Sequence, residues 1–328
     1  MRLISAAFLS VGLATPALAG VDEALSDHIL PGYAEFAEAT EDLMQAARND
    51  CRAEALQPAF HSAFDAWMPV ADIRLGPSET GALSIAFWPD TRGFTPRTLR
   101  RFMAEKDPIA GDVDGYAEVS IAARGLFALE MLIFDPEFAD YARGSYACQL
   151  VASVAADLHG QAEDLSSDWD TTYADTLRTA GAADNATYLT QEEAVRAIYT
   201  QILSSLEFTA NQRLGAPLGT FDRPRPARAE ARRSDRSLRN VMLAAQAAHG
   251  LATALSERDL PAIDAALQAV NEAAARIGDA AFKDVTDPQA RLHVEVLQQR
   301  VRSLHEAIQT EIGADLGIAP GFNAQDGD

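Results

Sequence analysis

One glutamate, Glu130, stands in an otherwise apolar run that extends from Leu126 to Phe134. A carboxylate among leucine, isoleucine and phenylalanine side chains is costly to bury unless a partner satisfies it. Such a residue therefore serves either a binding site or a structural ion pair. Gly125, directly before the run, would allow another segment to approach the backbone closely. Glu130 and Gly125 are the first candidate pocket residues.

Arginine is the expected partner of this glutamate, because a guanidinium binds a carboxylate through two parallel hydrogen bonds and stays charged when buried. Arg74 and Arg124 are the nearest candidates along the chain. An arginine-rich segment in the second half offers three more, which are Arg233, Arg236 and Arg239. We expect an ion pair between Glu130 and one of these arginines, at a junction of helices.

Trp88 and Asp90 belong to an aromatic segment that is interrupted by glycine and proline residues. A polar loop would not need such aromatics, so we expect an ordered crossover that packs over the helices, close to Glu130. In the arginine-rich segment, Ser234 or Asp235 is expected to cap the first turn of a helix that begins there. Trp88, Asp90 and Ser234 join the candidate pocket residues, with core packing and helix capping as the alternatives.

Two histidines have a carboxylate one helical turn away, and the two pairs are His61 with Asp65 and His159 with Glu163. Residues four apart share a helix face, so each pair could give a metal one nitrogen and one oxygen ligand. The alternative is a solvated surface pair. With Glu130, His159 and Glu163 are the candidate ligands for iron or another divalent metal.

The motifs of several enzyme classes are absent from the sequence, among them HExxH, GxSxG, CxxC and a glycine-rich phosphate loop. Each of these motifs demands a specific spacing, and the missing HExxH excludes the commonest zinc-protease arrangement. The residue pattern therefore assigns no catalytic residue.

Residues 1–19 have the features of a secretory signal peptide. Arg2 gives a positive start, an apolar core follows, and Ala17-Leu18-Ala19 fits the small-x-small cleavage rule. The core is too short to span a bilayer, and no later stretch is long and apolar enough. We expect an exported chain without a transmembrane segment, most simply in a bacterial periplasm.

The formal net charge is −21, and loss of Arg2 with the signal would make it −22. Such a balance argues against nucleic acid and anionic lipid surfaces as partners, whereas it permits the attraction of cations. Cys51 and Cys148 are the only cysteines. In an oxidising compartment an even pair most often forms a disulfide, and two buried free thiols are the alternative.

The hydrophobic pattern indicates an all-α fold. Apolar residues recur at spacings of three and four in several segments, for example Leu56, Phe60, Phe64 and Trp67, and no β-branched alternation is present. A polar junction begins at Asp168. We expect two bundles of up-and-down helices, with residues 20–168 in the first, which contains the ordered crossover, and residues 169–328 in the second, which includes a C-terminal tail.

Several segments occur in an order that resembles the imelysin family, which includes insulin-cleaving membrane protease and iron-regulated periplasmic proteins. They are Ala66-Trp67 with Arg74, Gly76-Pro77, Phe87 to Asp90, Gly125 to Phe134, Arg233-Ser234 and Gly321 to Asp328. The resemblance covers nearly the whole mature chain. It implies a two-bundle helical fold and a role linked to iron uptake in the bacterial envelope.

The resemblance also implies a metal site, because the family is catalogued as metallopeptidases with a glycine, a histidine and a glutamate in its signature. Gly125 and Glu130 match, but Phe127 stands where the histidine is expected, and a phenyl ring cannot ligate a metal. A zinc centre normally needs at least three protein ligands. We therefore expect no peptidase activity.

Three functions remain. The first is a periplasmic accessory factor of iron acquisition that binds a ligand, or a partner such as another envelope iron-uptake protein, in a polar pocket around Glu130. The second is a metallopeptidase that combines Glu130 with His159 and Glu163. The third is a helical scaffold whose polar pocket is only structural.

Overall fold

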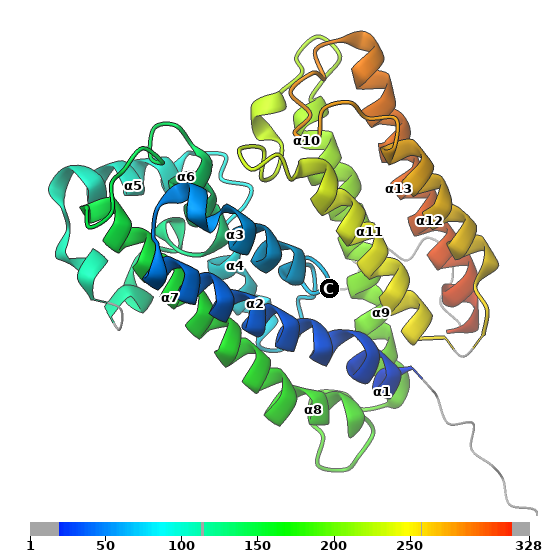
Figure 1. Cartoon of the computed structure of the whole chain (residues 1–328). Coiled ribbons are helices and arrows are strands. Elements are labelled where there is room, and N and C mark those ends of the chain that lie inside the picture. The colour runs from blue at the N-terminus through cyan, green and yellow to red at the C-terminus, as the bar shows by residue number, and fades with distance from the viewer. Residues whose placement is uncertain (1–19, 113–114, 257, 317–328) are drawn as a thin grey trace, which may run out of the picture.

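The computed structural model describes residues 20–112, 115–256 and 258–316, so the expected signal peptide and C-terminal tail lie outside the described residues. Within these ranges the chain forms helices and connecting turns, and no β-strand (Figure 1). This confirms the all-α prediction. None of the described helices combines the length and the apolar character needed to cross a membrane.

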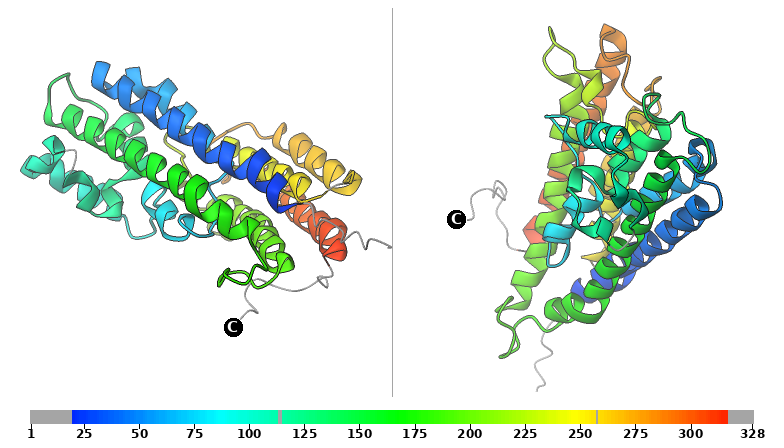
Figure 2. Two further views of the ribbon diagram at one scale, coloured as in Figure 1. Left: turned by 90° about the horizontal axis from the view of Figure 1, so that it is seen from below. Right: turned by 90° about the vertical axis from the view of Figure 1, so that its left-hand side faces the viewer.

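A first group of helices comes from the N-terminal half of the chain. In it α2 packs against both α3 and α7, and α6 packs against α3 and α7. Both views in Figure 2 keep α2 (blue) and α7 (green) side by side. The members of this first helix group are α1 (Val21–Ala24), α2 (Leu30–Asn49), α3 (Ala53–Trp67), α6 (Gly125–Phe134) and α7 (Tyr146–Asp168).

A second group forms from the C-terminal half, where α12 packs on α13, and α11 packs on α9 and α12 (Figure 1). Its long members are α9 (Gln191–Phe208), α11 (Ser237–Ala254), α12 (Pro261–Ala274) and α13 (Pro288–Asp315). The short α10 (Gly215–Leu218) joins them in the second helix group. The short α8 (Ala174–Arg178) instead continues α7 through one π-helical turn and contacts α1, so it belongs to the first helix group.

The apolar residues at helical spacing form the core. Leu56, Phe60, Phe64 and Trp67 lie on one face of α3 and are all buried, as expected for residues three and four apart. Buried side chains of both helix groups belong to one continuous hydrophobic cluster. In addition, α1 packs against α8, α9 and α11. The two groups therefore share a core, and the domain boundary at residue 168 stays a prediction.

The crossover between α3 and α6 is partly helical. It contains α4 (Ser78–Ile85) and α5 (Phe94–Glu105), with residues 86–93 as a non-helical link between them. Gly125 starts α6 at φ +71°, and a Cβ there would lie 2.2 Å from the carbonyl oxygen of Ile85. Only glycine permits this approach. Gly125 thus fixes α6 against the end of α4 and sets the place of Glu130.

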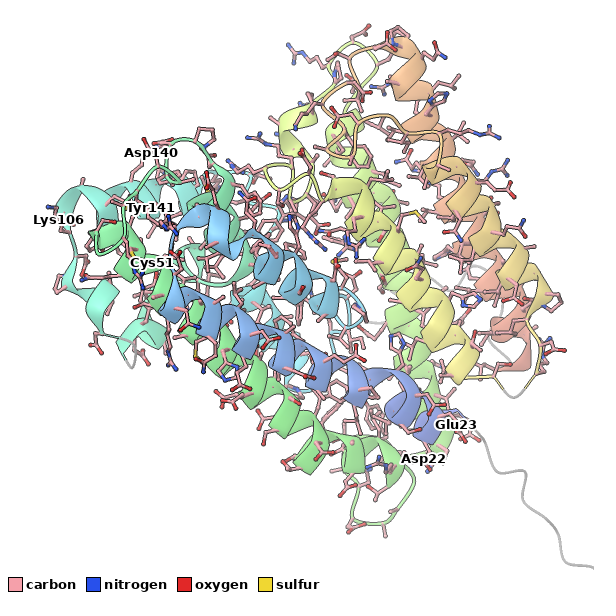
Figure 3. The ribbon with its side chains drawn as sticks, viewed as in Figure 1. Asp22, Glu23, Cys51, Lys106, Asp140 and Tyr141 are labelled. Carbon is pink, nitrogen blue, oxygen red and sulfur yellow. A yellow bond between two sulfur atoms is a disulfide. The ribbon has the colours of Figure 1, made fainter. Side chains whose placement is uncertain are left out.

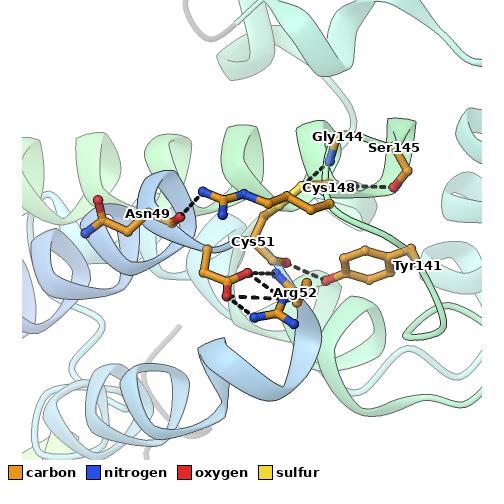
Figure 4. Close-up of a disulfide and its surroundings, with 9 residues drawn as sticks. Asn49, Cys51, Arg52, Tyr141, Gly144, Ser145 and Cys148 are labelled. Carbon is orange, nitrogen blue, oxygen red and sulfur yellow. Dashed lines mark hydrogen bonds and ion pairs between the residues drawn. A yellow bond between two sulfur atoms is a disulfide. The ribbon is translucent and has the colours of Figure 1, made fainter.

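The predicted disulfide between Cys51 and Cys148 is present (Figure 4). It joins the chain just after α2 to the first turn of α7, across 97 residues, with the two Cα atoms 5.3 Å apart. The Tyr141 hydroxyl donates to the carbonyl oxygen of Cys51 at 3.1 Å. Cys51 and Tyr141 lie at one end of the first helix group, and Asp22 lies at the other (Figure 3).

Candidate functional site

A pocket of about 260 Å³ lies between the first helix group and the segment that leads from α9 into α11. On one side the pocket is lined by α6 and by the crossover link between α4 and α5. Aromatic and proline side chains form one part of the wall, namely Phe87, Trp88, Pro89, Pro96 and Phe127. The polar part of the wall comes from both groups and contains Asp90, Thr95, Glu130, Gln212, Arg228 and Arg233.

Glu130 lies in the pocket wall and is only 1% exposed. Its Oε1 atom accepts three hydrogen bonds, from the backbone N–H of Arg233 at 2.9 Å, from the backbone N–H of Ser234 at 3.1 Å, and from the Ser234 hydroxyl at 3.0 Å. The Arg233 guanidinium instead binds Asp135, with Nε 2.5 Å from Oδ2. The expected ion pair between Glu130 and an arginine side chain is therefore wrong. Backbone amides take its place.

A tight turn supplies these amides. Ala231 and Asp235 both have positive φ, +45° and +55°, and between them the chain points two successive N–H groups at the carboxylate. Such successive amides form a concave site for an anion. Ser234 does not cap a helix, because α11 begins at Ser237 with Arg236 as its N-cap and without a side-chain cap. The capping interpretation of Ser234 is thus corrected.

Burial shifts the pKa of Glu130. Loss of water raises the pKa of this carboxyl, although the hydrogen bonds from Ser234 and the charge of Arg233 oppose the shift. All three donors reach Oε1, and no hydrogen bond from the described residues reaches Oε2. One carboxyl oxygen therefore remains for a ligand, and it can donate when protonated.

Phe127 is part of the aromatic wall. Its ring is stacked with Trp88, with centroids 6.4 Å apart and planes at 19°, and it meets Phe64 edge-on at 5.7 Å. Trp88 in turn meets the ring of Phe208 from the second helix group at 5.9 Å. The aromatic contacts thus link the crossover to both groups, and Phe127 lies in the same pocket as Glu130.

The other predicted pocket residues have partners of their own. Asp90 lines the pocket, but its carboxylate accepts the backbone N–H groups of Phe94 and Thr95 at 2.9 and 2.8 Å, at the start of α5. Arg124 forms a two-bond pair with Asp157 at 2.7 and 2.9 Å. The Arg74 guanidinium donates to the carbonyl oxygens of residues 71 and 73. The expectation that Arg74 or Arg124 pairs with Glu130 is wrong.

The two histidine pairs do not meet at the pocket. His61 and Asp65 both bind Arg236, and Asp65 also binds Arg239. Burial and the charge of Arg236 lower the pKa of His61. Asp65 therefore serves as an ion-pair partner, as does Asp157 beside Arg124.

The candidate metal ligands are not brought together. His159 contacts Glu163 at 3.4 Å on α7, and neither residue lines the pocket that contains Glu130. In the part of the chain that the structure describes, no group of three or more His, Cys, Asp or Glu side chains is placed to hold a metal ion. A metal at Glu130 would thus need ligands other than this predicted set.

Sequence reasoning missed a buried charge network behind the aromatic wall. Arg213, in the π-helix Thr209–Leu214 that continues α9, donates to both oxygens of Asp72, at 2.7 and 2.9 Å, and to Glu230 at 3.0 Å. Asn240 also donates to Glu230, at 3.1 Å. Asp72 lies between Ala71 and Ile73, so a charge among apolar neighbours was the available signal, as at Glu130.

A smaller cavity of about 30 Å³ borders this network. Its wall includes Asp72, Arg213 and Glu230, and also Trp88 and Phe127. Because the two aromatic residues line both cavities, they separate the pocket at Glu130 from the buried charges. Trp88 and Phe127 therefore line the pocket and also separate it from the smaller cavity.

Comparison with known proteins agrees with this architecture. The family model described as Imelysin matches residues 29–308. The chain therefore belongs to the imelysin family. No curated protein sequence matches it.

Two solved structures share the fold. An imelysin-like protein from Psychrobacter arcticum 273-4 has a TM-score of 0.76 at 17% identity, over 92% of this chain and 96% of that chain. A protein named iron-regulated protein A precursor, from Parabacteroides distasonis ATCC 8503, has a TM-score of 0.67 at 16% identity, over 88% of this chain and 92% of that chain. At such identities the likeness concerns the fold alone.

The place of Phe127 leads to a first prediction. The variant Phe127→His should bind Zn²⁺ at least about tenfold more tightly than the wild type, because it adds an imidazole to the pocket wall that already holds Glu130. Isothermal titration calorimetry measures the difference. Phe127→Leu is the matched control, since it also removes the ring and adds no ligand. Equal Zn²⁺ binding by the His and Leu variants would contradict the prediction.

Proposed function

We propose that the protein is an exported accessory factor of iron acquisition that binds a small ligand in the pocket beside Glu130. The observation that carries the proposal is the buried glutamate, which has one oxygen held by three donors and the other without a partner among the described residues. A glutamate that served only the fold would be expected to use both oxygens. The family and the iron-regulated structural relative support the link to iron.

Blocking the pocket tests this function. Ala227 is exposed and lines the mouth, so Ala227→Trp should fill the entrance without disturbing Glu130. In a bacterium that lacks its own copy, the wild-type gene should restore growth under iron limitation and the Ala227→Trp gene should not. Ala265→Trp, at an exposed position on α12, is the matched control. Equal rescue by both variants would rule out a function of this pocket and favour a structural scaffold.

Export is tested separately by cell fractionation. The mature chain should be found in the periplasmic fraction and should begin after Ala19, as the cleavage rule predicts. A full-length chain in the cytoplasmic fraction would contradict this part of the proposal.

We expect no peptidase activity, because the pocket offers a metal only Glu130 and an Asp90 that is already bound to the start of α5. Purified protein with added Zn²⁺ or Fe²⁺ should leave insulin and casein intact over hours, as judged by mass spectrometry of the products. Turnover that a chelator stops, and that Glu130→Gln also removes, would favour the metallopeptidase instead.

A further inference from the structure

Several polar side chains of the pocket are not used by the fold, among them Thr95, Gln212 and Arg228. Thr95 is 4% exposed, and its buried hydroxyl oxygen has no hydrogen-bond partner among the described residues. Arg228 is exposed and forms no ion pair within the described chain, and the Gln212 amide makes no side-chain hydrogen bond there. Buried polar groups without a partner are rare, so Thr95 indicates that a ligand completes the site.

These three groups favour an anion, because each can donate a hydrogen bond and Arg228 adds a positive charge. The two acids of the pocket are already bound by donors of the fold. Asp90 accepts two backbone N–H groups at the start of α5, and Oε1 of Glu130 accepts three hydrogen bonds from the turn before α11.

The opposite wall favours a flat apolar group. Phe87, Trp88 and Phe127 line the pocket, and the stacked pair of Trp88 and Phe127 leaves aromatic surface facing it. An engineered apolar cavity of roughly 150 Å³ holds one benzene molecule. The pocket here measures about 260 Å³, which leaves room for one ring and a small polar substituent.

We propose that the pocket binds a small single-ring aromatic carboxylate, with its ring against Trp88 and Phe127 and its carboxylate toward Arg228 and Thr95. This assignment rests on the proposed function and names the chemical class of its ligand. It makes the protein a binder of organic anions rather than of free metal ions.

Four probe molecules test the class by isothermal titration calorimetry on the purified mature chain. Benzoate is the expected ligand. Benzamide removes its charge, cyclohexanecarboxylate removes its aromatic ring, and benzylamine reverses its charge. Benzoate should bind at least about tenfold more tightly than each of the other three. If benzamide binds as tightly as benzoate, the pocket does not recognise the negative charge and the proposal is wrong. If cyclohexanecarboxylate binds as tightly, the pocket does not recognise the aromatic ring and the proposal is wrong as well.

Variants then locate the bound anion. Arg228→Gln should remove most of the preference for benzoate over benzamide, and Thr95→Val should weaken benzoate while it keeps the shape of the side chain. Arg225→Gln is the matched control, since Arg225 is also exposed, lies three residues away and does not line the pocket. A benzoate affinity that Arg228→Gln leaves unchanged would overturn the assignment.

The outcome separates this inference from the proposed function. If no probe binds but Ala227→Trp still abolishes growth under iron limitation, the ligand class is wrong and the binding function stands. If benzoate binds as predicted and the strain with the Ala227→Trp gene grows like the strain with the wild-type gene, the ligand class holds and the link to iron acquisition is wrong.

Discussion

Replacing Glu130 with alanine should lower the free energy of unfolding by about 3 kcal/mol or more. The substitution leaves the backbone N–H groups of Arg233 and Ser234 without an acceptor, and each buried donor that loses its partner costs about 1 to 3 kcal/mol. It also leaves a hole between α6 and the turn before α11. Urea unfolding, followed by circular dichroism with the disulfide intact, measures the change.

A matched control is available on the surface. Glu137 pairs with Arg100 at 2.5 Å, and both side chains are about half exposed, so Glu137→Ala should leave the free energy of unfolding nearly unchanged. If Glu130→Ala unfolds at the same urea concentration as the wild type, the three hydrogen bonds to Oε1 do not stabilise the fold and the description of the site is wrong.

The isosteric variant Glu130→Gln gives a prediction about pH. Burial raises the pKa of Glu130, so the folded protein holds this proton more tightly than the unfolded chain. The stabilisation by that proton is complete below the unfolded pKa, and it is lost as the pH rises toward the folded pKa. Glutamine has no such proton. The variant should therefore gain stability relative to the wild type as the pH rises above the usual glutamate range, and the opposite trend would mean that the donors lower the pKa.

The helices could be predicted from the sequence because they depend on local spacing. The face of α3 that carries Phe60, Phe64 and Trp67 is buried as its three- and four-residue spacing requires. The pairing of Cys51 with Cys148 followed from there being only two cysteines. The buried position of Glu130 followed from its apolar neighbours in α6.

The partner of Glu130 could not be predicted, for a physical reason. Arginine was expected because side-chain types are visible in a sequence, whereas two backbone amides are common to every residue. The turn that directs them uses positive φ at Ala231 and Asp235, which are not glycines and give no signal. The orphaned hydroxyl of Thr95 was equally hidden, since only the folded chain shows which hydroxyl lacks a partner.

The network around Arg213 was hidden by distance along the chain. Asp72 and Arg213 are separated by 141 residues, and Glu230 comes from a third segment. Each charge taken alone looks like an ordinary polar residue of a helix or turn. Only the packing of the two helix groups against each other brings the three together and removes them from water.

Replacing Arg213 with methionine should therefore destabilise the fold strongly, by about 3 to 5 kcal/mol, which is the usual cost of removing one partner from a buried ion pair. The guanidinium is 3% exposed and binds two carboxylates, with 13% exposure at Asp72 and 6% at Glu230. Methionine keeps much of the apolar stem but removes the arginine that forms an ion pair with both buried acids. Arg239→Met is the matched control, because Arg239 pairs with Asp65 and is 57% exposed.

The pH dependence of the Arg213→Met variant separates lost charge from lost packing. In the wild type, burial raises the pKa of Asp72, but Arg213 outweighs this effect and holds the pKa below its usual value. That contribution to stability is present above the unfolded pKa and is lost as the pH falls through the folded one. Without Arg213, only the Ser205 hydroxyl and the charge of Arg74 still oppose the effect of burial on Asp72, so the pKa of Asp72 should rise and the variant should regain stability as the pH falls below neutral. Urea unfolding of both proteins between neutral and acidic pH measures how the free energy of unfolding of each protein changes with pH. Parallel slopes would show that Arg213 acts through packing and not through its charge.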